Sequence, residues 1–79
     1  MAEKAVGVIW ELSGQVYFAA VTTPSGEVAF YLFIEPVRSR WHWAVWRPNE
    51  DEQAARHGLA DTVHEAMLAA ERALEARRS

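Results

Sequence analysis

Three residues in the second half of the chain are spaced loosely like metal ligands. They are His57, Asp61 and His64, and imidazole and carboxylate groups both bind zinc. His64, however, falls in the first turn of an expected helix, where its side chain is solvated, and the spacing is not that of the HExxH motif. Because a convincing third ligand is missing, we expect no metal site.

The hydroxyl residues offer no hydrolase triad, which would need a nucleophile, a base and a residue that orients the base. They lie at expected turns, at a helix cap or at the terminus, where turn chemistry accounts for most of them. The absence of cysteine excludes a disulfide framework and a thiolate metal site. We therefore expect neither an enzyme nor a cofactor. The hydroxyl residues are Ser13, Thr22, Thr23, Ser25, Ser39, Thr62 and Ser79.

The stretch RSRWHWAVWRP, residues 38–48, concentrates tryptophan and arginine. Aromatic rings can stack on bases and arginine can bind phosphate. Against this, strand alternation buries half of these aromatic residues, and the net charge of −3 provides no general basic field. A nucleic-acid-binding accessory protein that uses Arg38, Arg40 and Trp46 is therefore the alternative function, and nucleic acid is not the expected partner.

Four segments rich in β-branched and aromatic residues predict strands at 6–12, 16–22, 28–35 and 40–46. The strongest turn signal separates the second from the third, where Pro24 and Gly26 suit a hairpin. Residues 53–60 are ambiguous. They could pair with the tryptophan strand, with Gly58 at a bulge or a close approach, or form a short helix that Gly58 ends. We favour the strand.

The C-terminal segment predicts an amphipathic helix. Thr62 and Glu65 have the spacing of a capping box, which satisfies two backbone donors at a helix start. Apolar residues then recur at helical spacing and form one stripe. This stripe comprises Val63, Ala66, Met67, Ala70, Ala73 and Leu74.

We therefore predict a single domain, residues 1–79, with an α+β fold: an antiparallel sheet of four to five strands and one C-terminal helix on one face. Alternation places Trp41, Trp43 and Val45 on one face of their strand and Trp46 on the other. We assign Trp41 and Trp43, with Trp10 beside them, to the core under the helix.

The second face of the expected sheet is also apolar, and one helix covers only one face of a small sheet. Some of Tyr17, Tyr31, Phe33 and Trp46 would remain exposed, which is typical of an interaction site. We expect a second copy of the chain or another protein to cover this face. The alternative is a sheet that curls into a small barrel or roll and covers the face itself.

Binding energy concentrates in a few buried tryptophan, tyrosine and arginine residues surrounded by polar ones. The predicted contact centre consists of Tyr31, Phe33, Trp46 and Arg47. The predicted rim comprises Arg38 and Arg40. The acidic residues Glu50, Asp51 and Glu52 are predicted to steer the partner by their charge.

The sequence also resembles small phage and prophage proteins that carry a tryptophan-bearing β-hairpin followed by an amphipathic helix. The matching pattern is Trp41-x-Trp43-x-Val45, then Gly58-x-Ala60-x-Thr62-x-x-Glu65-Ala66 and Ala70-Glu71. It spans about residues 41–75. Small anti-CRISPR proteins are similar to this chain in length and general character. The resemblance implies a non-catalytic inhibitor that binds a Cas subunit or a Cascade-type complex and blocks DNA recognition or nuclease recruitment.

The N-terminal stretch MAEKAVGV lacks the apolar run of a signal peptide, and no segment has the length of a membrane span. We expect a chain that begins at its own initiator Met1 and acts in the cytoplasm, without membrane contact. If the gene is carried by a phage, that cytoplasm is the host's.

Overall fold

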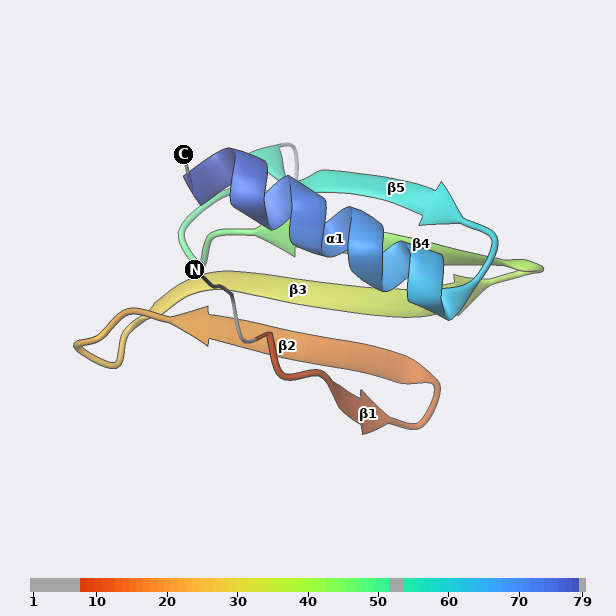
Figure 1. Cartoon of the computed structure of the whole chain (residues 1–79), viewed down its shortest axis with the longest axis horizontal. Coiled ribbons are helices and arrows are strands. Elements are labelled where there is room, and N and C mark those ends of the chain that lie inside the picture. Colours follow the sequence, from red (N-terminus) through yellow and green to blue (C-terminus); the bar gives the residue numbers. More distant parts are fainter. Residues whose placement is uncertain (1–7, 52–53, 79) are drawn as a thin grey trace, which may run out of the picture.

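The computed structural model describes residues 8–51 and 54–78 and shows an α+β fold (Figure 1). Five antiparallel strands form one sheet in the order β1-β2-β3-β4-β5, so every strand pairs with its neighbours in sequence. The helix follows the last strand. This confirms the predicted fold class, and the open strand order excludes a closed barrel. The elements are β1 (Glu11–Ser13), β2 (Val16–Thr22), β3 (Val28–Val37), β4 (Arg40–Trp46), β5 (Arg56–Ala60) and α1 (Val63–Arg78).

Turns at the expected places connect the first strands. Gly14 has a φ of 64° between β1 and β2, and Gly26 has a φ of 95° between β2 and β3. In the second turn the amide of Gly26 donates to the carbonyl of Thr23 at 2.9 Å. The predicted Pro24-Gly26 turn is therefore confirmed. Glycine, which has no Cβ, adopts such positive φ angles more readily than other residues do.

Within the ambiguous segment 53–60, residues 56–60 form β5, as favoured from the sequence, whereas residues 54 and 55 are not strand and residue 53 lies outside the described part. Because Gly58 lies inside this strand, the alternative of a short helix that Gly58 ends is wrong. Gly58 pairs with Trp43 across β4 and β5. A Cβ at Gly58 would lie 3.0 Å from the Cζ2 and Nε1 atoms of the Trp43 indole. The predicted close approach at Gly58 is therefore present, and a larger residue there would press on the indole that lies over the backbone.

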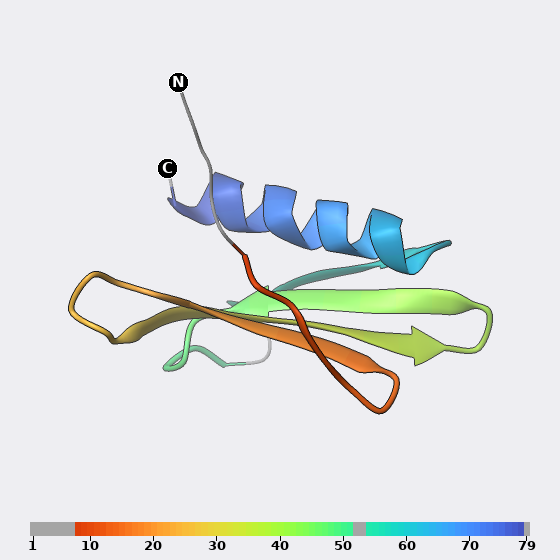
Figure 2. The same cartoon turned by 60° about the horizontal axis from the view of Figure 1, so that its bottom comes forward.

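The main core lies between the sheet and α1, which packs on β3, β4 and β5. Figure 2 shows the helix along one side of the sheet. The helix begins as predicted, since the Glu65 amide donates to the Thr62 hydroxyl at 3.1 Å. The alanines of the apolar stripe let the helix approach the strands closely. The fully buried residues of this layer are Leu32, Ile34, Val45, Ala66, Ala70 and Leu74.

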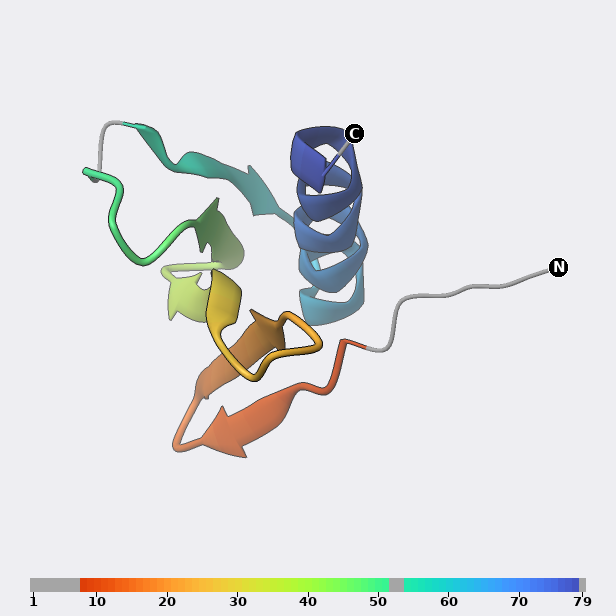
Figure 3. The same ribbon diagram turned by 90° about the vertical axis from the view of Figure 1, so that its left-hand side faces the viewer.

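The segment before β1 extends this core toward the other edge of the sheet. The predicted first strand was too long at its start: β1 begins at Glu11, residues 6 and 7 lie outside the described part, and residues 8–10 have no strand structure. Val8 and Trp10 instead pack against the core, and Figure 3 shows this segment passing close to α1. The indole Nε1 of Trp10 donates to Glu71 of the helix at 3.0 Å. Trp10 thus packs beside the core residues and is partly buried.

We expect Gly58→Ala to lower the free energy of unfolding by about 1 kcal/mol. Alanine in place of glycine normally stabilises a compatible strand position by roughly 0.4–1 kcal/mol. Here crowding against the Trp43 indole adds a larger penalty, since overpacking costs roughly 1–3 kcal/mol. Urea unfolding measures the change. Trp43→Phe combined with Gly58→Ala should recover part of the loss, because the smaller ring makes room. A stabilised Gly58→Ala protein would contradict the close approach.

Candidate binding face

The face of the sheet opposite α1 carries a row of aromatic side chains. Phe18, Phe33, Ala44 and His57 are successive cross-strand neighbours on β2, β3, β4 and β5. Tyr31 lies opposite Trp46, and Glu35 opposite His42. These side chains alternate with the core residues of the same strands, so they point away from the helix. We call this surface the open face; it comprises Phe18, Tyr31, Phe33, Glu35, His42, Ala44, Trp46 and His57.

Six rings of the open face contact one another in an unbroken chain. Such edge-to-face and stacked contacts add to the energy of apolar burial and hold each ring in one orientation. Because the rings are already ordered, a molecule that binds them loses little further side-chain entropy. The centroid separations are 6.0 Å for Phe18–Tyr31, 5.7 Å for Tyr31–Trp46, 5.5 Å for Trp46–Phe33, 5.7 Å for Phe33–His42 and 5.5 Å for His42–His57.

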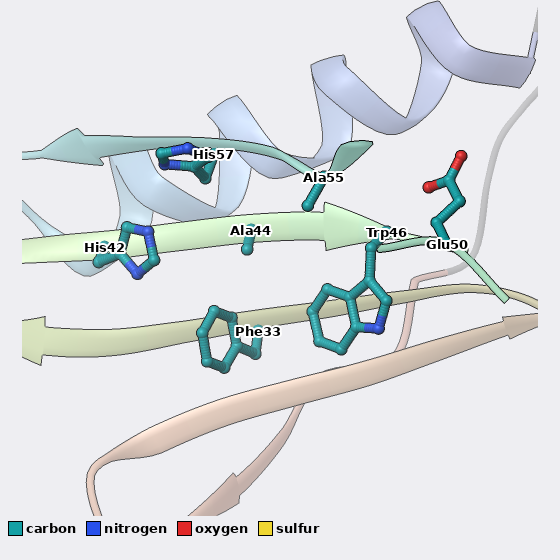
Figure 4. Close-up of a pocket in the computed structure, with 7 residues that line it drawn as sticks. All are labelled: Phe33, His42, Ala44, Trp46, Glu50, Ala55 and His57. Atoms are coloured by element: carbon teal, nitrogen blue, oxygen red, sulfur yellow. The ribbon is translucent and has the colours of Figure 1, made fainter. Parts of the chain in front are cut away.

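A pocket of about 500 Å³ opens on this face (Figure 4). Ala44 is buried beneath the surrounding rings and forms its floor. Glu50 and Ala55 come from the connection between β4 and β5, so this connection bounds one end of the pocket. The remaining lining side chains are Phe33, His42, Trp46 and His57. The pocket therefore combines an apolar floor with polar ring edges, a composition typical of binding sites.

Glu50 ties the β4–β5 connection to the end of the helix. Its Oε1 accepts a hydrogen bond from the Arg47 amide at 3.0 Å, and its Oε2 pairs with the guanidinium of Arg77. Arg77 also donates to the carbonyl of Ala54 at 3.4 Å. The hydrogen bond from Arg77, followed by that from the Arg47 amide, lowers the pKa of Glu50. Glu50 is thus bound within the protein and holds one wall of the pocket.

We expect Glu50→Gln to destabilise the protein near neutral pH. Because the folded state lowers the pKa of Glu50, the carboxylate stabilises the protein fully above the ordinary glutamate pKa. This contribution is lost as the pH falls from there through the lowered pKa. The melting temperatures of wild type and variant should therefore converge in acid. Glu11→Gln, on exposed β1, is the matched control and should change little. A difference that persists after Glu50 has been protonated would contradict this assignment.

The structure brings together three of the four residues predicted for the contact centre: Tyr31, Phe33 and Trp46. The fourth does not join them. The guanidinium of Arg47 lies over the ring of Phe30, 4.9 Å from its centroid, and Phe30 belongs to the core beneath the helix. The cation is therefore directed to the other side of the sheet.

The predicted rim residues lie at the far end of β4 from Trp46. Arg38 occupies the β3–β4 turn with a φ of 58°. Arg40 begins β4 and pairs with Asp61 at 3.6 Å. A strand of this length separates Arg40 from Trp46 by about 20 Å. Arg38, Arg40 and Trp46 therefore do not form one compact platform.

The remaining predicted residues belong to the acidic run. Asp51 is exposed, and its carbonyl accepts from the amide of Ala54 at 3.0 Å. Glu52 lies outside the described residues.

One residue considered for the second face is on the other side. Tyr17 pairs with Ile34 and therefore shares the face of α1. Its ring contacts Trp41 with centroids 6.2 Å apart. Phe18 takes its place on the open face and is 40% exposed. Alternation along β2 places Tyr17 and Phe18 on opposite faces of the sheet, but it does not indicate which of the two faces the helix.

Two histidines of the open face were not predicted as site residues. His42 is half-buried on this face, and its Nδ1 lies 3.1 Å from Oε2 of Glu35. His57 reaches the face only because residues 56–60 pair with β4. Alternation along a strand would have predicted this position: if Gly58 faces Trp43, its neighbour His57 points to the opposite face of the sheet.

The other sequence hypotheses have the following outcome. His57, Asp61 and His64 do not form a site together, since Asp61 pairs with Arg40. Across residues 8–51 and 54–78, no group of three or more His, Cys, Asp or Glu residues is arranged to hold a metal. No helix in the same part of the chain is long and apolar enough to cross a membrane.

No family model matches the sequence, and no curated protein or solved structure matches it either.

Proposed function

We propose that the chain is a non-catalytic protein-binding domain whose partner protein docks on the open face. The observation that supports this is the row of contacting rings on the side of the sheet away from α1. A small protein rarely exposes a contiguous aromatic surface unless another molecule covers it. Phe18 at one end of the row is already 40% exposed.

The charges around the open face favour a protein partner over nucleic acid. Arg47 lies over Phe30 and Arg40 pairs with Asp61. Nucleic-acid binding depends on cations that neutralise phosphates, and both Arg40 and Arg47 already have partners within the chain. Tyrosine and tryptophan, with an apolar body and one polar edge, are in contrast enriched at the centres of protein interfaces.

The resemblance over residues 41–75 supplies the proposed class of partner, a Cas subunit or a Cascade-type complex. These residues include β5 and most of β4 and α1, and hence Trp46 and His57 of the open face. The protein would inhibit by occupying a surface that the complex needs for DNA recognition or nuclease recruitment. It would act in the cytoplasm of the host.

A second copy of the chain is the competing occupant of the open face. A homodimer would bury the same aromatic rings of the open face. Sedimentation of the purified protein over a concentration series distinguishes the two. A stable dimer that masks the open face at all working concentrations would overturn docking of a different protein.

Site-specific photo-crosslinking tests the proposal directly. A photoreactive phenylalanine replaces Phe18 on the open face or, as the matched control, Leu68 on α1. These side chains are 40% and 42% exposed, so accessibility is equal. We expect one protein to crosslink from position 18 and not from position 68, and the purified partner to bind the wild-type chain. Equal crosslinking from both positions, or crosslinking to nucleic acid alone, would contradict the proposal.

A phage plaque assay tests the proposed class of partner. In cells whose CRISPR system targets the phage, expression of the wild-type chain should restore plaque formation. Cells without that system supply the control. If the open face binds a protein but no interference system is inhibited, protein binding stands and the Cas assignment is wrong.

A further inference from the structure

Two histidines of the open face lie side by side on adjacent strands. His57 on β5 pairs with Ala44, two positions beyond His42 on β4, so both imidazoles project from the same face. Their ring centroids are 5.5 Å apart, and the ring planes form an angle of 68°. His57 is exposed, and the side chain of His42 is 26% exposed. Both imidazoles are therefore accessible from solvent.

The separation of the two rings suits joint binding of one metal ion. Zinc binds imidazole nitrogen at about 2.0–2.1 Å in tetrahedral geometry, which puts the centroids of two ligating rings about 5 Å apart. The observed centroid separation of 5.5 Å is close to this value. Figure 4 shows a ring nitrogen of His42 on the side toward His57.

Glu35 orients His42 for this role. Its Oε2 lies 3.1 Å from Nδ1 of His42, and this side chain comes from β3, on the far side of β4 from His57. A carboxylate that accepts a hydrogen bond from Nδ1–H leaves the lone pair on Nε2, the nitrogen available to a metal. A histidine held in this way by a carboxylate is a recurrent arrangement at metal sites.

We infer that His42 and His57 bind one divalent transition-metal ion of the class that prefers imidazole, Zn²⁺, Ni²⁺ or Cu²⁺. Glu35 is a positioning residue, which acts through His42. The remaining coordination positions are open to water or to a donor from a bound molecule. The proposed site thus has two protein ligands, not three or more. The inference does not depend on the proposed function.

Calorimetric titration of the full-length, metal-free protein with each metal chloride tests the inference. We expect one ion per chain, and at least a tenfold loss of affinity in His42→Gln and in His57→Gln. Glu35→Gln should weaken binding by about tenfold, the lower end of the range for such supporting residues. His64→Gln is the matched control, since His64 is exposed on α1 outside the open face, and it should bind as wild type does.

Nuclear magnetic resonance of the histidine rings provides a second readout. On addition of zinc, the ring signals of His42 and His57 should shift together, while those of His64 stay in place. Circular dichroism without metal checks that each variant is folded; if His42→Gln fails this check, His57→Gln supplies the test. No saturable binding at millimolar metal, or equal losses in His64→Gln and His57→Gln, would overturn the inference.

Discussion

Trp43→Ala is expected to lower the free energy of unfolding by about 3 kcal/mol, the lower end of the range for tryptophan truncation in a core. Trp43 packs against the core beneath α1 and remains partly accessible. It lies between Ile34 and Gly58 in the sheet, and its indole covers the backbone of Gly58. The alanine variant would leave a cavity there. Urea unfolding, followed by tryptophan fluorescence and circular dichroism, measures the loss.

The natural control is Trp46→Ala, which removes the same side chain from the opposite face of the same strand. Its loss of stability should be clearly smaller, because no helix packs over Trp46. If Trp46→Ala unfolded the protein while Trp43→Ala remained stable, the two faces of the sheet would have been assigned the wrong way round.

Trp46→Ala is expected to weaken binding of the partner protein by about 2 kcal/mol, or roughly 30-fold. Trp46 contacts both Tyr31 and Phe33 and lines the pocket, so it occupies the centre of the aromatic row. Its removal takes away the largest side chain of the open face and the ring contacts to Tyr31 and Phe33. Calorimetry with the partner identified by crosslinking measures the change, and the plaque assay should show a parallel loss of inhibition.

Leu68→Ala controls for a general effect of removing an exposed apolar side chain. Leu68 lies on α1, and its replacement should leave affinity unchanged. The open-face assignment fails if folded Trp46→Ala protein retains wild-type affinity, or if Leu68→Ala loses as much affinity as Trp46→Ala does.

Local patterns were sufficient to predict most elements of this protein. The Pro24–Gly26 turn and the Thr62 cap depend on residues a few positions apart, whose backbone preferences act within one turn. Alternation along β4 similarly separates Trp43 from Trp46 without reference to the rest of the chain. From these elements the α+β fold and the two apolar faces of the sheet follow directly.

Pairing between segments decided what local pattern left open. Residues 53–60 suit either a strand or a short helix, and the contact between Gly58 and the Trp43 indole accompanies the strand. The same pairing brings His57 beside His42. On β2, Tyr17 and Phe18 are both aromatic, and the register with β3 determines which one faces the helix.

The sequence by itself thus determined the turns, the helix and the alternation of each strand, because these depend on neighbours along the chain. Only the tertiary structure decided how the charged residues are used. Arg77 pairs with Glu50 across 27 positions, and Trp10 with Glu71 across 61. Arg47 likewise turns to the ring of Phe30. Such contacts arise when packing brings distant segments together, and no spacing in the sequence encodes them.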